Sequence, residues 1–176
     1  MNKILKRSLL CATLLFTGCS HSTAFDFFSV DSYYEKAVSN MKKASLMNAL
    51  ETKALLHAVY LNNVDPKTYN DGEYFFVSIY IIEDAFDPKK HGLKNLDYRL
   101  QMLSSDVNQK SKKVYISPEE LTELEEDHVL RRTMPIQTNW SHYYLIKFPI
   151  NNDSQVKLSF ENDRYGKVPL VFPKEI

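Results

Sequence analysis

The residues that precede Cys19 indicate the chemistry of its thiol, and no catalytic partner residue does so. Three basic residues within the first seven are followed by an uncharged run over residues 8–16 and by the small pair Thr17-Gly18. Charged, apolar and small, in that order, is the pattern of an export signal. The apolar run is shorter than the 20 or so residues that span a bilayer. The first 18 residues are therefore predicted to direct export, and Cys19 follows them directly.

The stretch Leu14-Leu15-Phe16-Thr17-Gly18-Cys19 resembles the signal of bacterial lipoproteins, with Phe16 where leucine is usual. This resemblance implies that the chain is cut before Cys19, whose sulfur is diacylated and whose new amino end is acylated too. Two or three acyl chains such as palmitate anchor a protein permanently, whereas one chain is reversible. Ser20 after the cysteine implies the outer membrane, in either leaflet. The alternatives are a plain secretory signal and a single membrane helix with an incidental cysteine.

The charge and cysteine content exclude several functions. The 176 residues include 22 basic and 22 acidic side chains, and loss of the first 18 residues leaves 19 basic residues against 22 acidic ones. Nucleic acid and polybasic membrane surfaces need clustered Lys and Arg, so neither is expected as a partner. Cys11 lies in the predicted signal and Cys19 would carry lipid, as the resemblance implies, so no thiol would remain for a disulfide, a zinc site or a nucleophile. The few glycines have no phosphate-binding spacing.

Other catalytic residue types lack the spacing that their chemistry needs. No two histidines stand four residues apart, and neither an H-E-x-x-H nor a G-x-S-x-G motif occurs. No metal site and no cofactor is therefore predicted, and only a carboxylate pair remains conceivable for catalysis. The five histidines are His21, His57, His91, His128 and His142.

Two local clusters are candidate contact surfaces. The only tryptophan, Trp140, stands beside His142, Tyr143 and Tyr144 at the start of a strand pattern. These four residues form a possible interface, since Trp and Tyr supply much of the binding energy at hot spots. The alternative is that Trp140 lies in the core and plugs one end of the fold. A dense acidic run precedes Arg131 and Arg132 and is either a solvated helix face or a docking patch for a basic partner. The acidic residues are Glu119, Glu120, Glu123, Glu125, Glu126 and Asp127.

The first half of the chain is predicted to form one helix and three strands. Apolar residues at helical spacing indicate a helix from about Asp31 to Leu50, with its Met-containing face in the core. Residues 53–62 alternate as a strand, although a continued helix is the alternative. Residues 73–83 form the clearest strand. They are apolar on both faces, so this strand is expected inside a covered sheet, or with one face partly capped by the N-terminal helix. A further strand is expected over 97–103.

The second half is predicted to hold a short helix among strands. After a short strand at 114–116, Ser117-Pro118-Glu119-Glu120 favours the start of a helix that ends near Glu126. Strand patterns over 141–148, 155–160 and 168–172 have short connections and indicate an antiparallel meander. Pro169 places the last strand at a sheet edge or bulge.

Together these elements indicate a mainly β fold, an antiparallel immunoglobulin-like β-sandwich of about seven strands with an N-terminal helix and a short second helix. The expected organisation is a signal peptide at 1–18, a lipidated tether at 19–29 and one domain at 30–176. In outline the chain is similar to small surface or periplasmic lipoproteins of Gram-negative bacteria with an immunoglobulin-like or transthyretin-like sandwich.

That resemblance implies an envelope lipoprotein that is anchored in membrane lipid through acylated Cys19. We expect it to act without catalysis, as a protein-binding or assembly module. The alternatives are a docking subunit of an envelope or secretion complex and a carboxylate-based hydrolase. The protein partner and the oligomeric state are left open.

Overall fold

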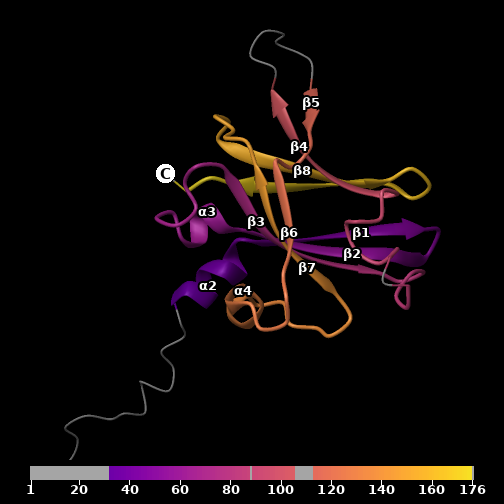
Figure 1. Ribbon diagram of the computed structural model, residues 1–176. Coiled ribbons are helices and arrows are strands. Elements are labelled where there is room, and N and C mark those ends of the chain that lie inside the picture. Colours follow the sequence, from indigo (N-terminus) through magenta and orange to yellow (C-terminus); the bar gives the residue numbers. More distant parts are fainter. Residues whose placement is uncertain (1–31, 88, 106–112, 176) are drawn as a thin grey trace, which may run out of the picture. The chain divides into compact units, whose positions relative to one another are not determined.

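A computed structural model describes residues 32–87, 89–105 and 113–175 (Figure 1). In these ranges the fold is mainly β, with two antiparallel sheets and three helices, which confirms the predicted class. Nine strands are described, against about seven expected. The elements are α2 (Ser32–Ser39), β1 (Met41–Asn48), β2 (Glu51–Tyr60), α3 (Leu61–Val64), β3 (Glu73–Ile81), β4 (Tyr98–Ser105), β5 (Lys113–Ile116), β6 (Glu120–Glu123), α4 (Val129–Thr133), β7 (His142–Phe148), β8 (Gln155–Asn162) and β9 (Gly166–Pro173).

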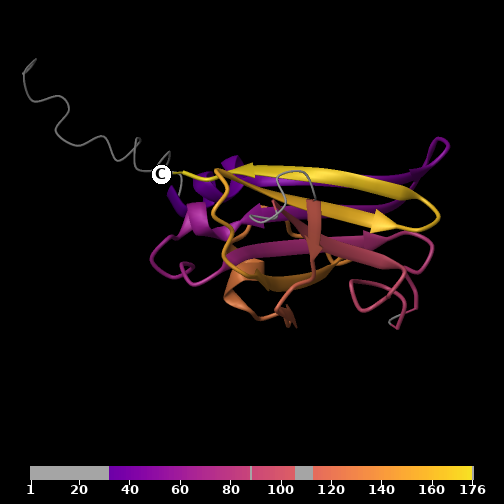
Figure 2. The same cartoon turned by 90° about the horizontal axis from the view of Figure 1, so that it is seen from above.

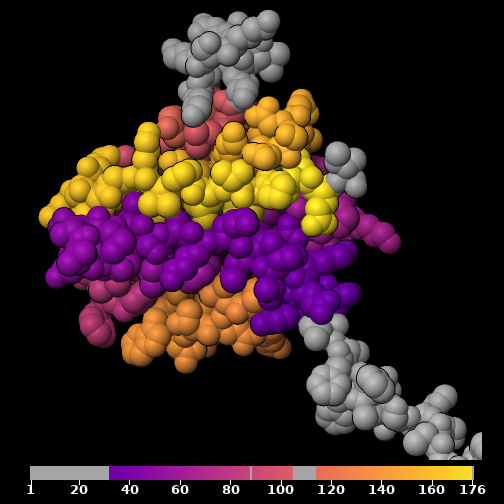
Figure 3. Space-filling model, turned by 180° about the vertical axis from the view of Figure 1, so that it is seen from behind, coloured from indigo at the N-terminus to yellow at the C-terminus, as the bar shows by residue number. Residues whose placement is uncertain are grey.

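The two sheets pack face to face. The five-stranded sheet has the order β1-β2-β3-β7-β6, and the four-stranded sheet has the order β5-β4-β8-β9. Figure 2 shows the two layers from above. On one flank β1 lies against β9, so the edges of the two sheets meet there (Figure 3). The largest buried side chains between the sheets are Tyr60, Phe75, Tyr144, Phe148, Phe160 and Phe172.

A second apolar core lies on the outer face of the five-stranded sheet. Alternate residues of β3 point to opposite faces. Phe75 belongs to the core between the sheets, whereas Phe76 belongs to the outer core. Ala37 of α2 and Leu130 of α4 cover Phe76 there. Both faces of β3 are therefore buried in this half of the sheet, as its sequence predicts, and the N-terminal helix supplies part of the cover.

The predicted helix over residues 31–50 is wrong beyond Ser39. Both the backbone N–H and the side-chain amide of Asn40 donate to the Lys36 carbonyl at 3.0 Å, and the Asn40 carbonyl accepts from the Tyr60 N–H at 3.2 Å. The chain then continues as β1, where Ala44 and Leu46 are buried in the core between the sheets. Pairing with β2 outweighs the local helical spacing. The alternating pattern from Lys53 does form a strand, and α3 begins at Leu61.

The predicted helix over residues 117–126 is also wrong. Residues Glu120–Glu123 form β6, which pairs with β7, and the Glu119 N–H donates to the Lys147 carbonyl at 2.8 Å. The short helix comes later, as α4. His128 caps it, since its Nδ1 accepts from the Leu130 N–H at 3.2 Å. Pairing of β6 with β7 therefore outweighs the local preference of residues 117–120 for the start of a helix.

The predicted meander of the last three strands is only partly present. β8 and β9 pair as a hairpin, but β7 belongs to the other sheet, so the chain crosses between the sheets after Phe148. Pro169 lies in β9, the last strand of its sheet, as expected for proline at an edge.

Residues Ser32–Ile176 form one compact unit that contains both cores. The predicted signal peptide, Cys19 and the tether lie outside the described residues. Figure 1 shows α2, α3 and the C-terminus at one end of this unit, which we call the near end. The turn between β1 and β2 and the loop between β3 and β4 lie at the opposite, far end.

A buried carboxylate ties the near end together. Glu73 is 2% exposed and accepts from the Tyr60 hydroxyl at 2.5 Å, from the Asn151 N–H at 2.8 Å and from Lys174 Nζ at 2.6 Å. Burial, followed by this hydrogen bond to Glu73, raises the pKa of Tyr60 far above its usual value. The carboxylate joins β2, β3 and the C-terminal segment, so it holds the end at which the described chain begins.

The Glu73→Ala substitution should lower the free energy of unfolding by about 3 kcal/mol, because buried donors on Tyr60 and Asn151 lose their acceptor. Urea unfolding followed by circular dichroism measures this difference. Glu120→Ala, at an exposed position on β6, is the matched control and should change stability by no more than about 0.5 kcal/mol. Equal effects of the two substitutions would contradict the structural role of Glu73.

Candidate functional site

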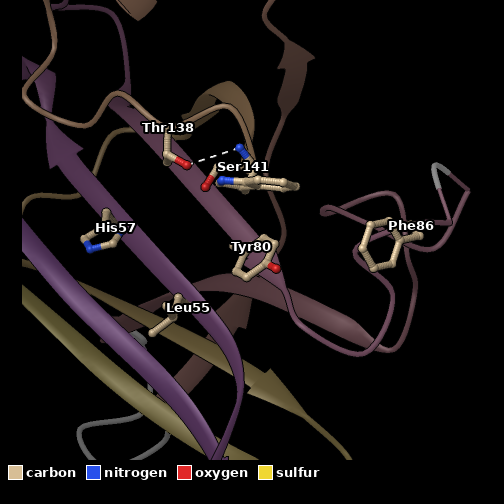
Figure 4. A pocket seen from close by; sticks show the side chains of 7 residues that line it. Leu55, His57, Tyr80, Phe86, Thr138 and Ser141 are labelled. Atoms are coloured by element: carbon tan, nitrogen blue, oxygen red, sulfur yellow. Dashed lines mark hydrogen bonds between the residues drawn. The ribbon is translucent and has the colours of Figure 1, made fainter.

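The helices cover only part of the outer face of the five-stranded sheet, and a hollow of about 400 Å³ lies beside the covered part (Figure 4). Two strands form its floor, and two loops that are far apart in sequence form its walls. We call it the aromatic hollow. Its lining residues are Leu55, His57, Tyr80, Phe86, Thr138, Trp140 and Ser141.

The floor consists of neighbouring residues on β2 and β3. Leu55 pairs with Tyr80 across the ladder, and His57 pairs with Ser78. Because side chains on a strand alternate in direction, these residues share the outer face. Ser78 is 1% exposed, and its hydroxyl has no hydrogen-bond partner among the residues that the structure describes. Burial lowers the pKa of His57, and the nearby Lys43 lowers it further, so the imidazole is neutral at pH 7.

The Trp140 wall is fixed to the sheet by a tyrosine. The hydroxyl of Tyr143 accepts from the Thr138 N–H at 2.7 Å and donates to the Thr138 carbonyl at 2.8 Å. The Thr138 hydroxyl in turn accepts from the Trp140 N–H at 3.1 Å, the interaction drawn in Figure 4. Trp140 itself is 67% exposed. The segment is therefore held in place while its large side chain faces solvent.

The Phe86 wall belongs to the loop between β3 and β4. The base of this loop is held by His91, whose Nε2 accepts from the Ile81 N–H at 3.2 Å, and by Leu93, whose N–H donates to the Tyr144 hydroxyl at 3.2 Å. Between them, Gly92 has a φ of +97°, and a Cβ there would lie 2.3 Å from the Tyr144 hydroxyl oxygen. Only glycine fits this close approach. Phe86, at 94% exposure, extends from a loop with a fixed base.

A group of titratable side chains lies beside the hollow. The rings of His91 and His142 are 4.7 Å apart, and the His91 ring also contacts Tyr80 at 5.4 Å. His142 Nδ1 is 2.5 Å from Glu123 Oε1, and Lys94 pairs with the other carboxylate oxygen. Burial raises the pKa of Glu123, but hydrogen bonds from Lys94 and His142 outweigh it, so the net shift is downward. This carboxylate is an ionised bridge between the loop and β7.

The four predicted interface residues do not share one exposed surface. Trp140 is exposed, so the alternative that it plugs the core is wrong, and His142 is partly buried. Tyr143 and Tyr144 are 2% and 0% exposed and belong to the outer and inner cores. They position the two walls of the hollow through their hydroxyl groups, as described above.

Local sequence patterns contain little sign of the remaining lining residues. Leu55, His57 and Tyr80 were assigned to strands but not to a common site, because their contact depends on the register of β2 and β3. Phe86 lies between the strand patterns over 73–83 and 97–103, in a segment to which no site was assigned. Its one usable signal is a large aromatic residue in the Asp84–Asp87 turn, where the Asp87 N–H donates to the Asp84 carbonyl.

The acidic run lies next to the hollow but on no helix. Glu123, Glu126 and Arg131 line polar depressions on the far side of the Thr138–Ser141 segment. Arg131 stacks over the Tyr143 ring at 4.5 Å and donates to the Leu124 carbonyl. The apolar hollow is therefore bordered by a surface that carries both acidic and basic side chains.

Within the described ranges, no group of three or more His, Cys, Asp or Glu side chains is placed to hold a metal ion. None of the helices described is long and apolar enough to cross a membrane. Comparisons of the chain with protein-family models, with curated proteins and with solved structures found no match.

His91 should make the protein less stable in mild acid. Burial, with a contribution from His142, lowers the pKa of His91 to about 4 from its usual 6.5. Between these two pKa values the unfolded chain binds more protons than the folded protein. The contribution of neutral His91 to the free energy of unfolding is therefore complete above pH 6.5 and is lost as the pH falls towards 4. The loss from one group approaches about 1.4 kcal/mol per pH unit.

The His91→Gln variant keeps an acceptor for the Ile81 N–H but cannot titrate. Its stability should therefore fall less steeply than that of the parent between pH 6.5 and pH 4.5, as measured by urea unfolding at several pH values. His57→Gln, the second neutral imidazole, should remove a further share of the slope. Identical slopes for the parent and His91→Gln would contradict the neutral state of His91.

Proposed function

We propose that this protein is a lipid-anchored envelope lipoprotein that acts, without catalysis, as a binding module for a protein partner. Acylation of Cys19 would fix it to the outer membrane, and the sandwich would present its far end to the partner. The lipoprotein-type signal at residues 14–19 supports the anchor.

The position of α2, where the described unit begins, supports the proposal that the far end faces the partner. The described unit begins at Ser32 in α2, at the near end, 13 residues after Cys19. The loop that bears Phe86 and the turn that bears Leu50 lie at the opposite end (Figure 1). A domain that is tethered before α2 can direct these loops away from the membrane.

One observation carries the proposal: two large aromatic side chains are exposed where the loops could have buried them. Phe86 is 94% exposed and Trp140 is 67% exposed, on either side of the aromatic hollow. Exposed aromatic residues grouped on one surface are typical of interaction sites. Trp in particular is enriched among residues that dominate binding energy. Both residues stand on segments that are fixed at their base, which reduces the entropy lost on binding.

Site-specific photo-crosslinking in the cell tests this proposal. A photoreactive phenylalanine analogue at position 86 or 140 should yield the same crosslinked protein. The matched control is the same analogue at Ile150, which is 61% exposed but follows β7 near the end that holds Glu73. Crosslinks from position 150 alone, or none from positions 86 and 140, would contradict presentation of the far end.

The same experiment separates a free binding module from a docking subunit of an envelope complex. A partner recovered at fixed stoichiometry from membranes would favour the docking subunit. Repeating the crosslinking with Cys19→Ala should abolish the product if membrane position is needed. An unchanged product would show that the anchor only concentrates the domain.

A further inference from the structure

The aromatic hollow is larger than a single protein side chain needs. Its volume of about 400 Å³ lies within the range of about 300–1,000 Å³ that is usual for small-molecule sites. Its floor is built on paired strands, and both of its walls are fixed at the base by Tyr143, His91 and Leu93. The hollow is therefore preformed rather than a gap between mobile loops.

The lining determines the charge of a suitable ligand. None of the seven lining residues is an acid, a lysine or an arginine, and the one titratable ring, His57, is neutral at pH 7. An ionised ligand would lose hydration in the hollow without gaining an ion pair, which is unfavourable. The occupant is expected to be uncharged.

The hydrogen-bonding groups determine the rest of its chemistry. The Thr138 hydroxyl already accepts from the Trp140 N–H. Within the described part of the chain, neither the His57 ring nor the Tyr80 hydroxyl makes a hydrogen bond, so each is open to a ligand. The lining also holds the Ser141 hydroxyl and the Trp140 indole N–H, and these few separate polar groups suit a ligand with one or two hydrogen-bonding atoms. A sugar, which carries a hydroxyl on most of its carbons, would leave most of its groups unpaired.

The wall and floor residues favour rings. Trp140, Phe86 and Tyr80 present aromatic surfaces from three separate segments, and Leu55 adds an aliphatic floor. Aromatic rings attract one another in offset or edge-to-face arrangements beyond the gain from burial alone. Figure 4 shows Tyr80 on the floor between the two loop segments that carry Phe86 and Thr138.

We propose that the aromatic hollow is a binding site for an uncharged small molecule with aromatic rings and one or two hydrogen-bonding atoms. This site shares Phe86 and Trp140 with the surface of the proposed function, but it rests on the hollow and its lining and stands whether or not a protein partner exists.

The test uses N-phenyl-1-naphthylamine, an uncharged aromatic compound whose fluorescence rises in apolar surroundings. The full chain with Cys19→Ala should bind it saturably, with a dissociation constant on the order of 100 μM or tighter for a ligand of this size. Trp140 is the only tryptophan, so excitation at the indole should transfer energy to the bound probe. Transfer that saturates with the same constant places the probe beside Trp140.

A matched pair of substitutions locates the binding. Leu55→Arg puts a charge on the floor of the hollow and should weaken binding roughly tenfold or more. Leu50→Arg makes the same change at a 94% exposed position outside the lining and should leave binding unchanged. Circular dichroism checks the fold of both. Phe86→Ser, at an exposed position that needs no packing, should also weaken binding and serves if Leu55→Arg fails to fold.

Three results would overturn the proposal. One is no saturable binding of the probe, and another is equal binding by the parent, Leu55→Arg and Phe86→Ser. The third is displacement of the probe by N-acetylglucosamine, because this would make the site one for sugars. Loss of the crosslinks described under the proposed function would leave this test unaffected, so the two proposals can fail separately.

Discussion

The five-stranded sheet has two apolar faces but only one partner sheet, and this constraint shapes the molecule. One face of β3 buries Phe75 against the four-stranded sheet. Its other face carries Phe76 and Tyr80, and apolar surface of this extent is costly to leave in water. The short helices α2 and α4 cover the part around Phe76. Where their cover ends, the sheet becomes the floor of the aromatic hollow, so the same constraint produces both the second core and the candidate site.

Buried hydroxyl and imidazole groups convert this sheet into a support for exposed loops. Tyr143 and Tyr144 extend from β7 in opposite directions, and each hydroxyl holds the backbone of a different loop. At the end of β3, the His91 ring accepts a hydrogen bond from the Ile81 N–H, as a neighbouring strand would do elsewhere in the sheet. These contacts use neutral groups, which can be buried at low cost when they are hydrogen-bonded. The far end therefore combines fixed loop bases with exposed aromatic side chains.

The fold class was predictable from the sequence because strand alternation and apolar content are local signals. The two apolar faces of β3 predicted that both would be covered, and partial cover by the N-terminal helix was one of the two alternatives. The failures have one cause. β1 and β6 carry helix-favouring residues, but each pairs with another strand: β1 with the adjacent β2, and β6 with β7, which follows after α4. Of the residues that line the hollow, only Trp140 was a candidate contact residue in the sequence, with a place in the core as the alternative. The other lining residues meet through strand register and loop packing, which no local pattern records, and Tyr143 and Tyr144 proved to be supports rather than contact residues.

Because Trp140 is the only tryptophan, its fluorescence reports directly on the central claim that the outer face of the sheet is open towards the far end. The decisive measurement is quenching of this fluorescence by acrylamide, a small uncharged quencher, in the folded protein. The account predicts emission typical of tryptophan in water and quenching almost as efficient as in the unfolded chain. Emission shifted to the blue, with strong protection that is lost only on unfolding, would show that this face is covered and would contradict the account.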